Sequence, residues 1–109
     1  MSSSSSPLRS AFADDAEFGE LIGLFVAEMP DRIETIDSAV AERDMKSLQI
    51  VAHQLKGAGG GYGFSEITEA GRRLEHLAET ADAEIQDDVA RVTEAANALV
   101  DLCSRATAS

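Results

Sequence analysis

The sequence has little of several residue types: no tryptophan, one tyrosine, one cysteine and two prolines in 109 residues. A lone cysteine excludes an internal disulfide, and Cys103 falls on an apolar helical stripe, where we expect a buried thiol. β-branched residues do not alternate along the chain, and prolines rarely interrupt it, so the pattern favours helices over strands. The length suits a single domain with one modest core.

Positive charge is also scarce. Nine lysines and arginines stand against 20 aspartates and glutamates, which gives a formal net charge of −11. Such a surface repels phosphate backbones and anionic lipids, so we expect no nucleic acid and no membrane surface as partner. No apolar run approaches the ~20 residues that span a bilayer, and Met1 followed by five serines is unlike a signal peptide. We expect a cytoplasmic protein, with a monomer as the default.

The chain divides into a polar start and a long region of helical periodicity. Residues 1–10 are rich in serine, which predicts a disordered tail, and residues 11–109 are predicted to form one helical domain. The first apolar stripe passes Pro30 without changing phase. The sequence therefore allows one helix kinked there, or a short helix followed by a second helix with Pro30 in its first turn.

Further helices are indicated by capping residues and by apolar positions at three- and four-residue steps. Asp44 and Ser65 are expected to cap the next two helices, and a last helix is expected to begin near Ala83. Short connections make neighbouring helices antiparallel. The predicted fold is all-α, an antiparallel up-and-down four-helix bundle, with an optional short extra helix at the N-terminus.

The stretch VAHQLKGAGGGYG, residues 51–63, places five glycines directly after a histidine and a lysine. One interpretation is a flexible loop after a helix that ends near Lys56. A phosphate-cradling loop fits poorly, because no frame matches G-x-G-x-x-G and the lysine precedes the glycines. A helix is favoured, because one apolar stripe continues through the run: Leu48, Val51, Ala52, Leu55, Gly59 and Tyr62.

His53 lies about 150° around this helix from the centre of the apolar stripe, so the imidazole is expected to face solvent. Gly57 and Gly60 share the outer face, where they would leave room for an approaching surface, at about 1 kcal/mol each relative to alanine. Gly59 lies on the inner face, where it would let a neighbouring helix pack closely. The outer face also carries three residues one to two turns before the histidine: Lys46, Gln49 and Ile50.

His53 has neighbours that suit nucleophilic chemistry, whereas His76 has none and is interpreted as a solvated surface residue. The chain's only two lysines, Lys46 and Lys56, lie on the helix of His53 and predict a local positive patch suited to a phosphoryl group. A nucleophilic imidazole also needs an acceptor for the hydrogen on its second nitrogen. Glu75, at the edge of the next helix's stripe, is a candidate, although an ordinary surface glutamate fits the pattern too.

Other catalytic groupings are absent from the sequence. It contains no Ser-His-Asp grouping and no histidine pair with metal-ligand spacing, which argues against a hydrolase or a metalloenzyme.

The stretch AHQLKGAGGGYG resembles the signature of histidine-containing phosphotransfer (HPt) domains, and the matching residues are His53, Lys56, Gly57, Gly60 and Gly63. In this family an exposed histidine accepts a phosphoryl group from an aspartyl phosphate on a receiver domain and can pass it to another receiver. The resemblance implies that His53 is the phosphoacceptor and that Lys56 interacts with the phosphoryl group. It also implies that Gly57 keeps the approach open and that Glu75 hydrogen-bonds the imidazole.

The resemblance further implies a partner surface and a role in signalling. The expected partners are receiver domains of response regulators or hybrid histidine kinases, which would dock on Lys46, Gln49, Ile50, Gly57 and Gly60. The domain would be a phosphoryl carrier in a multistep His-Asp phosphorelay, without an ATP site, turnover, metal site or cofactor of its own, and Mg²⁺ would belong to the receiver. The alternatives are an interaction module that docks without being phosphorylated, a fragment of a larger kinase, and an unrelated bundle with His53 as a bystander.

Overall fold

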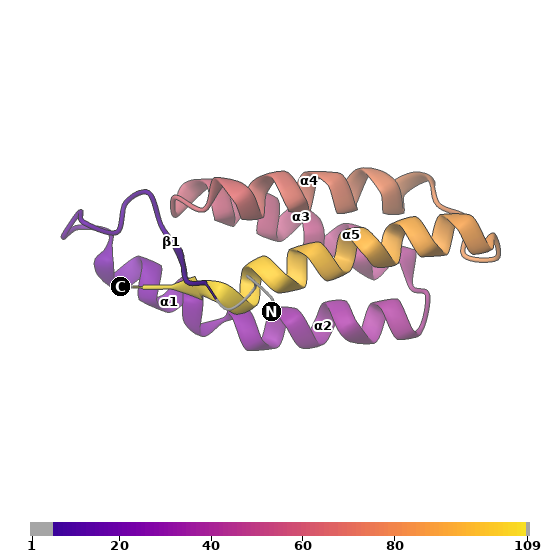
Figure 1. Cartoon of the computed structure of the whole chain (residues 1–109), viewed down its shortest axis with the longest axis horizontal. Coiled ribbons are helices and arrows are strands. Elements are labelled where there is room, and N and C mark those ends of the chain that lie inside the picture. Colours follow the sequence, from indigo (N-terminus) through magenta and orange to yellow (C-terminus); the bar gives the residue numbers. More distant parts are fainter. Residues whose placement is uncertain (1–5, 109) are drawn as a thin grey trace.

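The computed structural model describes residues 6–108, which contain five helices and two short strands (Figure 1). The helices are α1 (Gly19–Ala27), α2 (Met29–Ala41), α3 (Met45–Gly61), α4 (Ser65–Thr80) and α5 (Gln86–Arg105). Helices α2 to α5 run alternately up and down, and each packs against two others in a ring, α3 on α4, α4 on α5, α5 on α2 and α2 on α3. The predicted all-α four-helix bundle is confirmed, and α1 is the short extra helix.

Of the two alternatives that the sequence allowed at Pro30, the structure has a short helix followed by a second helix. Helix α1 ends at Ala27, and α2 begins at Met29 with Pro30 in its first turn, where a missing backbone N–H costs no helical hydrogen bond. Met29 is buried, and so are Ile22 and Phe25 of α1. The apolar stripe therefore continues across the break because both helices cover the same core.

The cap predicted for α3 is confirmed. The Asp44 carboxylate accepts a hydrogen bond from the Ser47 backbone N–H at 3.0 Å and another from the Ser47 hydroxyl at 2.7 Å. These two hydrogen bonds hold the pKa of Asp44 below its usual value. The cap predicted at Ser65 is wrong by one position: Ser65 is the first residue of α4, and Phe64 is its N-cap, without a side-chain hydrogen bond. Helix α5 starts at Gln86, later than predicted.

The packed domain begins earlier in the chain than residue 11. Residues 1–5 lie outside the described residues, but Leu8–Arg9 form strand β1, which pairs in parallel with strand β2 (Ala106–Thr107). Leu8 and Ser10 are buried, and the Ser10 hydroxyl donates to the backbone carbonyl of Tyr62. The predicted tail boundary at residue 10 is therefore corrected: the segment from Leu8 on packs against the domain.

The core runs along the axis of the bundle, and its fully buried side chains come from all five helices. Cys103 belongs to it with 1% exposure, and burial raises the pKa of its thiol to about 12, as expected for an inert core cysteine. No helix within residues 6–108 has both the length and the apolar character that crossing a bilayer requires.

Candidate functional site

The glycine run belongs to a helix. Helix α3 continues to Gly61, so the interpretation as a loop after Lys56 is wrong. Its inner face is buried at Leu48, Val51, Ala52, Leu55 and Gly59, and the opposite face is left to solvent. The predicted outward direction of His53 is confirmed, since its side chain is 68% exposed in the middle of α3.

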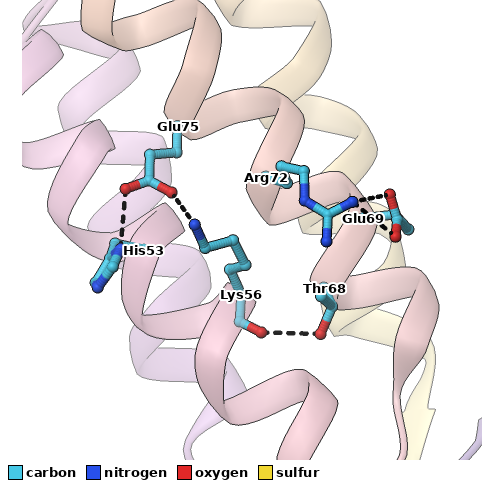
Figure 2. A network of polar contacts seen from close by, with 6 residues as sticks. All are labelled: His53, Lys56, Thr68, Glu69, Arg72 and Glu75. Atoms are coloured by element: carbon cyan, nitrogen blue, oxygen red, sulfur yellow. Dashed lines mark hydrogen bonds and ion pairs between the residues drawn. The ribbon is translucent and has the colours of Figure 1, made fainter.

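Glu75 of α4 joins the two candidate residues of α3. One carboxylate oxygen, Oε2, lies 2.9 Å from Nδ1 of His53, and the other, Oε1, lies 2.8 Å from Nζ of Lys56 (Figure 2). The Lys56 hydrogen bond is the main cause that holds the pKa of Glu75 below its usual value; partial burial opposes it, and the His53 hydrogen bond adds to it. Glu75 is therefore a carboxylate at neutral pH and can only accept hydrogen bonds.

The ionised Glu75 decides which nitrogen of His53 carries the hydrogen. Because a carboxylate cannot donate, Nδ1 must be the donor across the 2.9 Å contact, and a neutral imidazole then has its lone pair on Nε2. Figure 2 shows the ring edge opposite Nδ1 pointing away from α4. The arrangement presents a nucleophilic nitrogen to an approaching molecule and holds the second nitrogen against the protein.

The positive patch predicted from the two lysines is partly neutralised. Lys56 pairs with Glu75 at 2.8 Å, and its side chain is only 31% exposed. Lys46 is exposed and lies one to two turns before His53 on the same face of α3. The site therefore contains one lysine that is paired with a carboxylate, Lys56, and one exposed lysine, Lys46.

The predicted partner-binding residues of the first half of α3 surround the histidine. An open depression beside the imidazole is lined by Lys46, Gln49, Ile50, His53, Gln54 and Glu75. Ile50 is 49% exposed and supplies its apolar part, whereas the Gln49 amide is half-buried and donates to the Ala78 carbonyl of α4 at 3.3 Å. Sequence reasoning missed Gln54, which accepts a hydrogen bond from Arg32 of α2 at 2.5 Å. The adjacency of α2 to α3 produces that contact, and no local pattern signals it.

The glycines after Lys56 have different surroundings. A Cβ added to exposed Gly57 would meet nothing within 4 Å, so the space above it is open. At Gly60 a Cβ would lie 3.3 Å from the Thr68 hydroxyl, and at Gly59 it would lie 3.1 Å from the same atom. Gly57 therefore leaves open space on the outer face of α3, as predicted. Gly59 allows the neighbouring segment to pack closely, which was also predicted. Gly60 lies on the outer face too, but a side chain there would crowd Thr68 of α4.

A family model described as Hpt domain matches residues 20–108, from α1 to the end of the described chain. The chain belongs to the Hpt domain family. No curated protein and no solved structure matches it significantly. Hpt domains are phosphocarrier modules of two-component phosphorelays, so the chain has a histidine phosphotransfer role in signalling.

The two arginines of α4 in this Hpt domain form ion pairs away from His53. Arg72 pairs with Glu69 at 2.8 Å along its own helix (Figure 2), and Arg73 pairs with Glu94 of α5 at 3.4 Å. His76 is exposed. Across residues 6–108 no three histidine, cysteine, aspartate or glutamate side chains gather closely enough to hold a metal ion.

The lowered pKa of Glu75 predicts how this Hpt domain responds to acid. The Glu75 contacts stabilise the fold above pH 4.5, the ordinary pKa of the group, and this contribution is lost as the pH falls through the lower pKa of the folded state. A carbon-13 titration of the Glu75 carboxyl group should give a midpoint below 4.5. Lys56→Met should raise that midpoint more than His53→Gln, because Lys56 is the larger cause; the reverse order would contradict the assignment.

Proposed function

We propose that Nε2 of His53 accepts a phosphoryl group from an aspartyl phosphate on a receiver domain and later passes it to another receiver. The observation that carries this proposal is the contact of Nδ1 with Glu75 at 2.9 Å, which in the neutral imidazole leaves the lone pair on Nε2, at the exposed edge of the ring. The family assignment supports the class of reaction, and the site geometry supports the choice of His53 over His76.

The step exchanges one bond for another. The Nε2 lone pair attacks phosphorus in line with the scissile P–O bond, the N–P bond forms, and the aspartate carboxylate of the receiver departs with the bonding electron pair. No proton has to move, because Nδ1 keeps its hydrogen on Glu75 and the carboxylate offsets the positive charge that develops on the ring. The Mg²⁺ and the lysine that neutralise the phosphoryl oxygens in the receiver remain with that partner.

Lys56 changes partner in this mechanism. In the free domain its ammonium binds Glu75 at 2.8 Å, one turn along α3 from His53. A phosphoryl group on Nε2 brings about two negative charges within reach of a flexible lysine side chain. Lys56 then contacts the phosphoryl oxygens, and Glu75 retains Nδ1 of His53.

The receiver docks on the outer face of α3. The depression beside the imidazole offers Ile50 as an apolar contact and Lys46 as a charge for the acidic phosphorylation site of a receiver. Beyond His53, the missing side chains at Gly57 and Gly60 let the partner's backbone come close to the helix. The domain acts in the cytoplasm as a carrier, without ATP, turnover or cofactor of its own.

The proposal is tested with a panel of phosphorylated receivers carrying radiolabelled phosphate, in the presence of Mg²⁺. We expect acid-labile label on this chain and nitrogen-15 to phosphorus-31 coupling at Nε2 of His53. Coupling at Nδ1, or label on another residue, would overturn the assignment of the nucleophilic atom. Docking of receivers without any label would favour the alternative of an interaction module.

Gly57→Ala is expected to separate stability from transfer. The added methyl group meets no atom within 4 Å in the free domain, so the variant should be more stable by up to about 1 kcal/mol, the helix preference of alanine over glycine. Against a docked receiver the same methyl group displaces the reacting atoms, and transfer should fall about tenfold or more. Gly61→Ala is the matched control, because its added methyl group also meets nothing within 4 Å. Equal transfer by both variants would contradict a close approach at Gly57.

A further inference from the structure

One face of α4 packs against a single turn of α3. Thr68, Gly71 and Glu75 lie at positions i, i+3 and i+7, so they line up along the same side of their helix. All three contact the α3 turn from Ala52 to Lys56, the turn that carries the histidine. Glu75 holds side chains there, whereas Thr68 and Gly71 act on the backbone.

The Thr68 hydroxyl crosses between the helices. Its Oγ1 donates a hydrogen bond of 2.9 Å to the backbone carbonyl of Lys56, and Figure 2 shows this bond beside the contact of the Lys56 ammonium with Glu75. A threonine inside a helix usually bonds the carbonyl four residues earlier in its own helix. Here the Phe64 carbonyl receives the Thr68 backbone N–H at 3.2 Å, and the hydroxyl is directed to α3. Both ends of Lys56, carbonyl and ammonium, are therefore held by α4.

The glycines make room for this bond. Added Cβ atoms at Gly59 and Gly60 would lie 3.1 and 3.3 Å from Oγ1 of Thr68. Alanine at either position would therefore crowd the hydroxyl. On the other side, a Cβ at Gly71 would lie 3.0 Å from the Ala52 carbonyl and 3.1 Å from the Lys56 nitrogen. The backbones of the two helices approach closely at Gly71, and the Thr68 side chain packs against Gly59 and Gly60, so the register of the helices is constrained as well as their separation.

Register matters because Glu75 must reach two side chains at once. Its oxygens lie 2.9 Å from Nδ1 of His53 and 2.8 Å from Nζ of Lys56, and the His53 side chain is largely exposed to competing water. A shift of α4 along α3 by a fraction of a turn would lengthen one of these contacts. The Thr68 bond lies on the same stripe, about two turns from Glu75, and opposes such a shift.

We infer that Thr68 is a positioning residue: its hydrogen bond to the Lys56 carbonyl sets the register in which Glu75 holds Nδ1 of His53, and so sets the nucleophilic state of the imidazole. This inference rests on the proposed function only for its consequence in phosphoryl transfer. The effect on the imidazole itself exists in the free domain, without any partner.

The test compares Thr68→Val, which keeps the shape and removes the hydroxyl, with Thr68→Ser, which keeps the hydroxyl. The first readout is the fraction of neutral His53 with its hydrogen on Nδ1, measured by nitrogen-15 NMR in the free domain. We expect this fraction to fall in Thr68→Val and to return to the wild-type value in Thr68→Ser. Transfer at saturating receiver should fall about fivefold in Thr68→Val, the effect of one lost hydrogen bond, and recover in Thr68→Ser.

Thr35→Val is the matched control. The Thr35 hydroxyl also donates to a backbone carbonyl, that of Asp31 at 3.0 Å, but within its own helix α2. It should leave the His53 tautomer unchanged although it removes the same kind of bond. If Thr68→Val does not fold, Thr68→Ala removes the hydroxyl with a smaller side chain, and the same NMR comparison applies.

The outcomes separate this inference from the proposed function. A wild-type tautomer fraction in folded Thr68→Val, or equal losses in Thr68→Val and Thr68→Ser, would overturn the positioning role, whatever the transfer assay gives. A reduced Nδ1–H fraction that serine restores would support it even if no receiver labelled the wild-type domain, and the failure would then belong to the proposed function alone.

Discussion

Replacing His53 by glutamine is expected to reduce phosphoryl acceptance to background, because no other group at the site can form the covalent intermediate. Lys56 is protonated and paired, and Glu75 is directed at its two partners rather than at solvent. Glutamine keeps a polar side chain of similar size on an exposed helical position, so the fold and the docking surface should survive. The measurement is transfer of radiolabel from a phosphorylated receiver with Mg²⁺, together with receiver binding and thermal unfolding.

His76→Gln provides the matched control for that experiment. It removes the chain's second histidine, which is exposed on α4, and it should leave labelling at the wild-type level. Label that persists in His53→Gln and disappears in His76→Gln would transfer the phosphoacceptor role to α4. Loss in both variants would point to a helix-packing effect and not to the nucleophile.

The direction of His53 was predictable because it depends on one helix alone. The 3.6-residue period places the apolar positions of residues 48–62 on one side, and the structure buries that side and exposes the histidine. The Asp44 cap is local in the same sense, since its partner Ser47 is three residues away. Features that depend only on one or two turns of a single helix can be predicted from the sequence.

The Lys56–Glu75 ion pair was not predictable in the same way, because it depends on the register between α3 and α4. The helical projection placed Glu75 near His53 but left Lys56 as a free cation. In the structure, close packing at Gly71 and the Thr68 hydrogen bond bring one carboxylate to both side chains. A hydroxyl at position i and a glycine at i+3, in a helix that follows a glycine run, are a sequence signal for such close helix packing. Many helices share this pattern, however.

The packing of the N-terminal segment was not predictable, for a related reason. Its serine content predicts disorder, but Leu8 is buried because β1 pairs with β2 at the opposite end of the chain. A pairing between distant segments leaves almost no trace in local composition. Gly63 carries one indirect sign of it: its φ is positive, at 84°, and an added Cβ would overlap the Ser10 hydroxyl, so glycine is the residue that fits beside this segment.

Lys56→Met is expected to lower the rate of transfer at saturating receiver about 100-fold, near the effect of removing one donor to a developing anion in other active sites. Methionine keeps most of the aliphatic stem, which is largely covered in the structure, and removes the charge. Glu75 loses its main partner but still faces Nδ1 of His53, so the imidazole should keep the Nδ1–H tautomer. The loss should then appear in the chemical step and not in the preparation of the nucleophile.

Lys46→Met is the matched control for Lys56→Met, since it removes the only other lysine from the same helix. Lys46 lines the docking depression and has no ion pair with Glu75 in the described structure, so its loss should weaken receiver binding, more at low salt than at high salt, and leave the saturated rate near wild type. A wild-type saturated rate in Lys56→Met would mean that Lys56 serves only to anchor Glu75. The receiver's own cations would then neutralise the phosphoryl group without help from this domain.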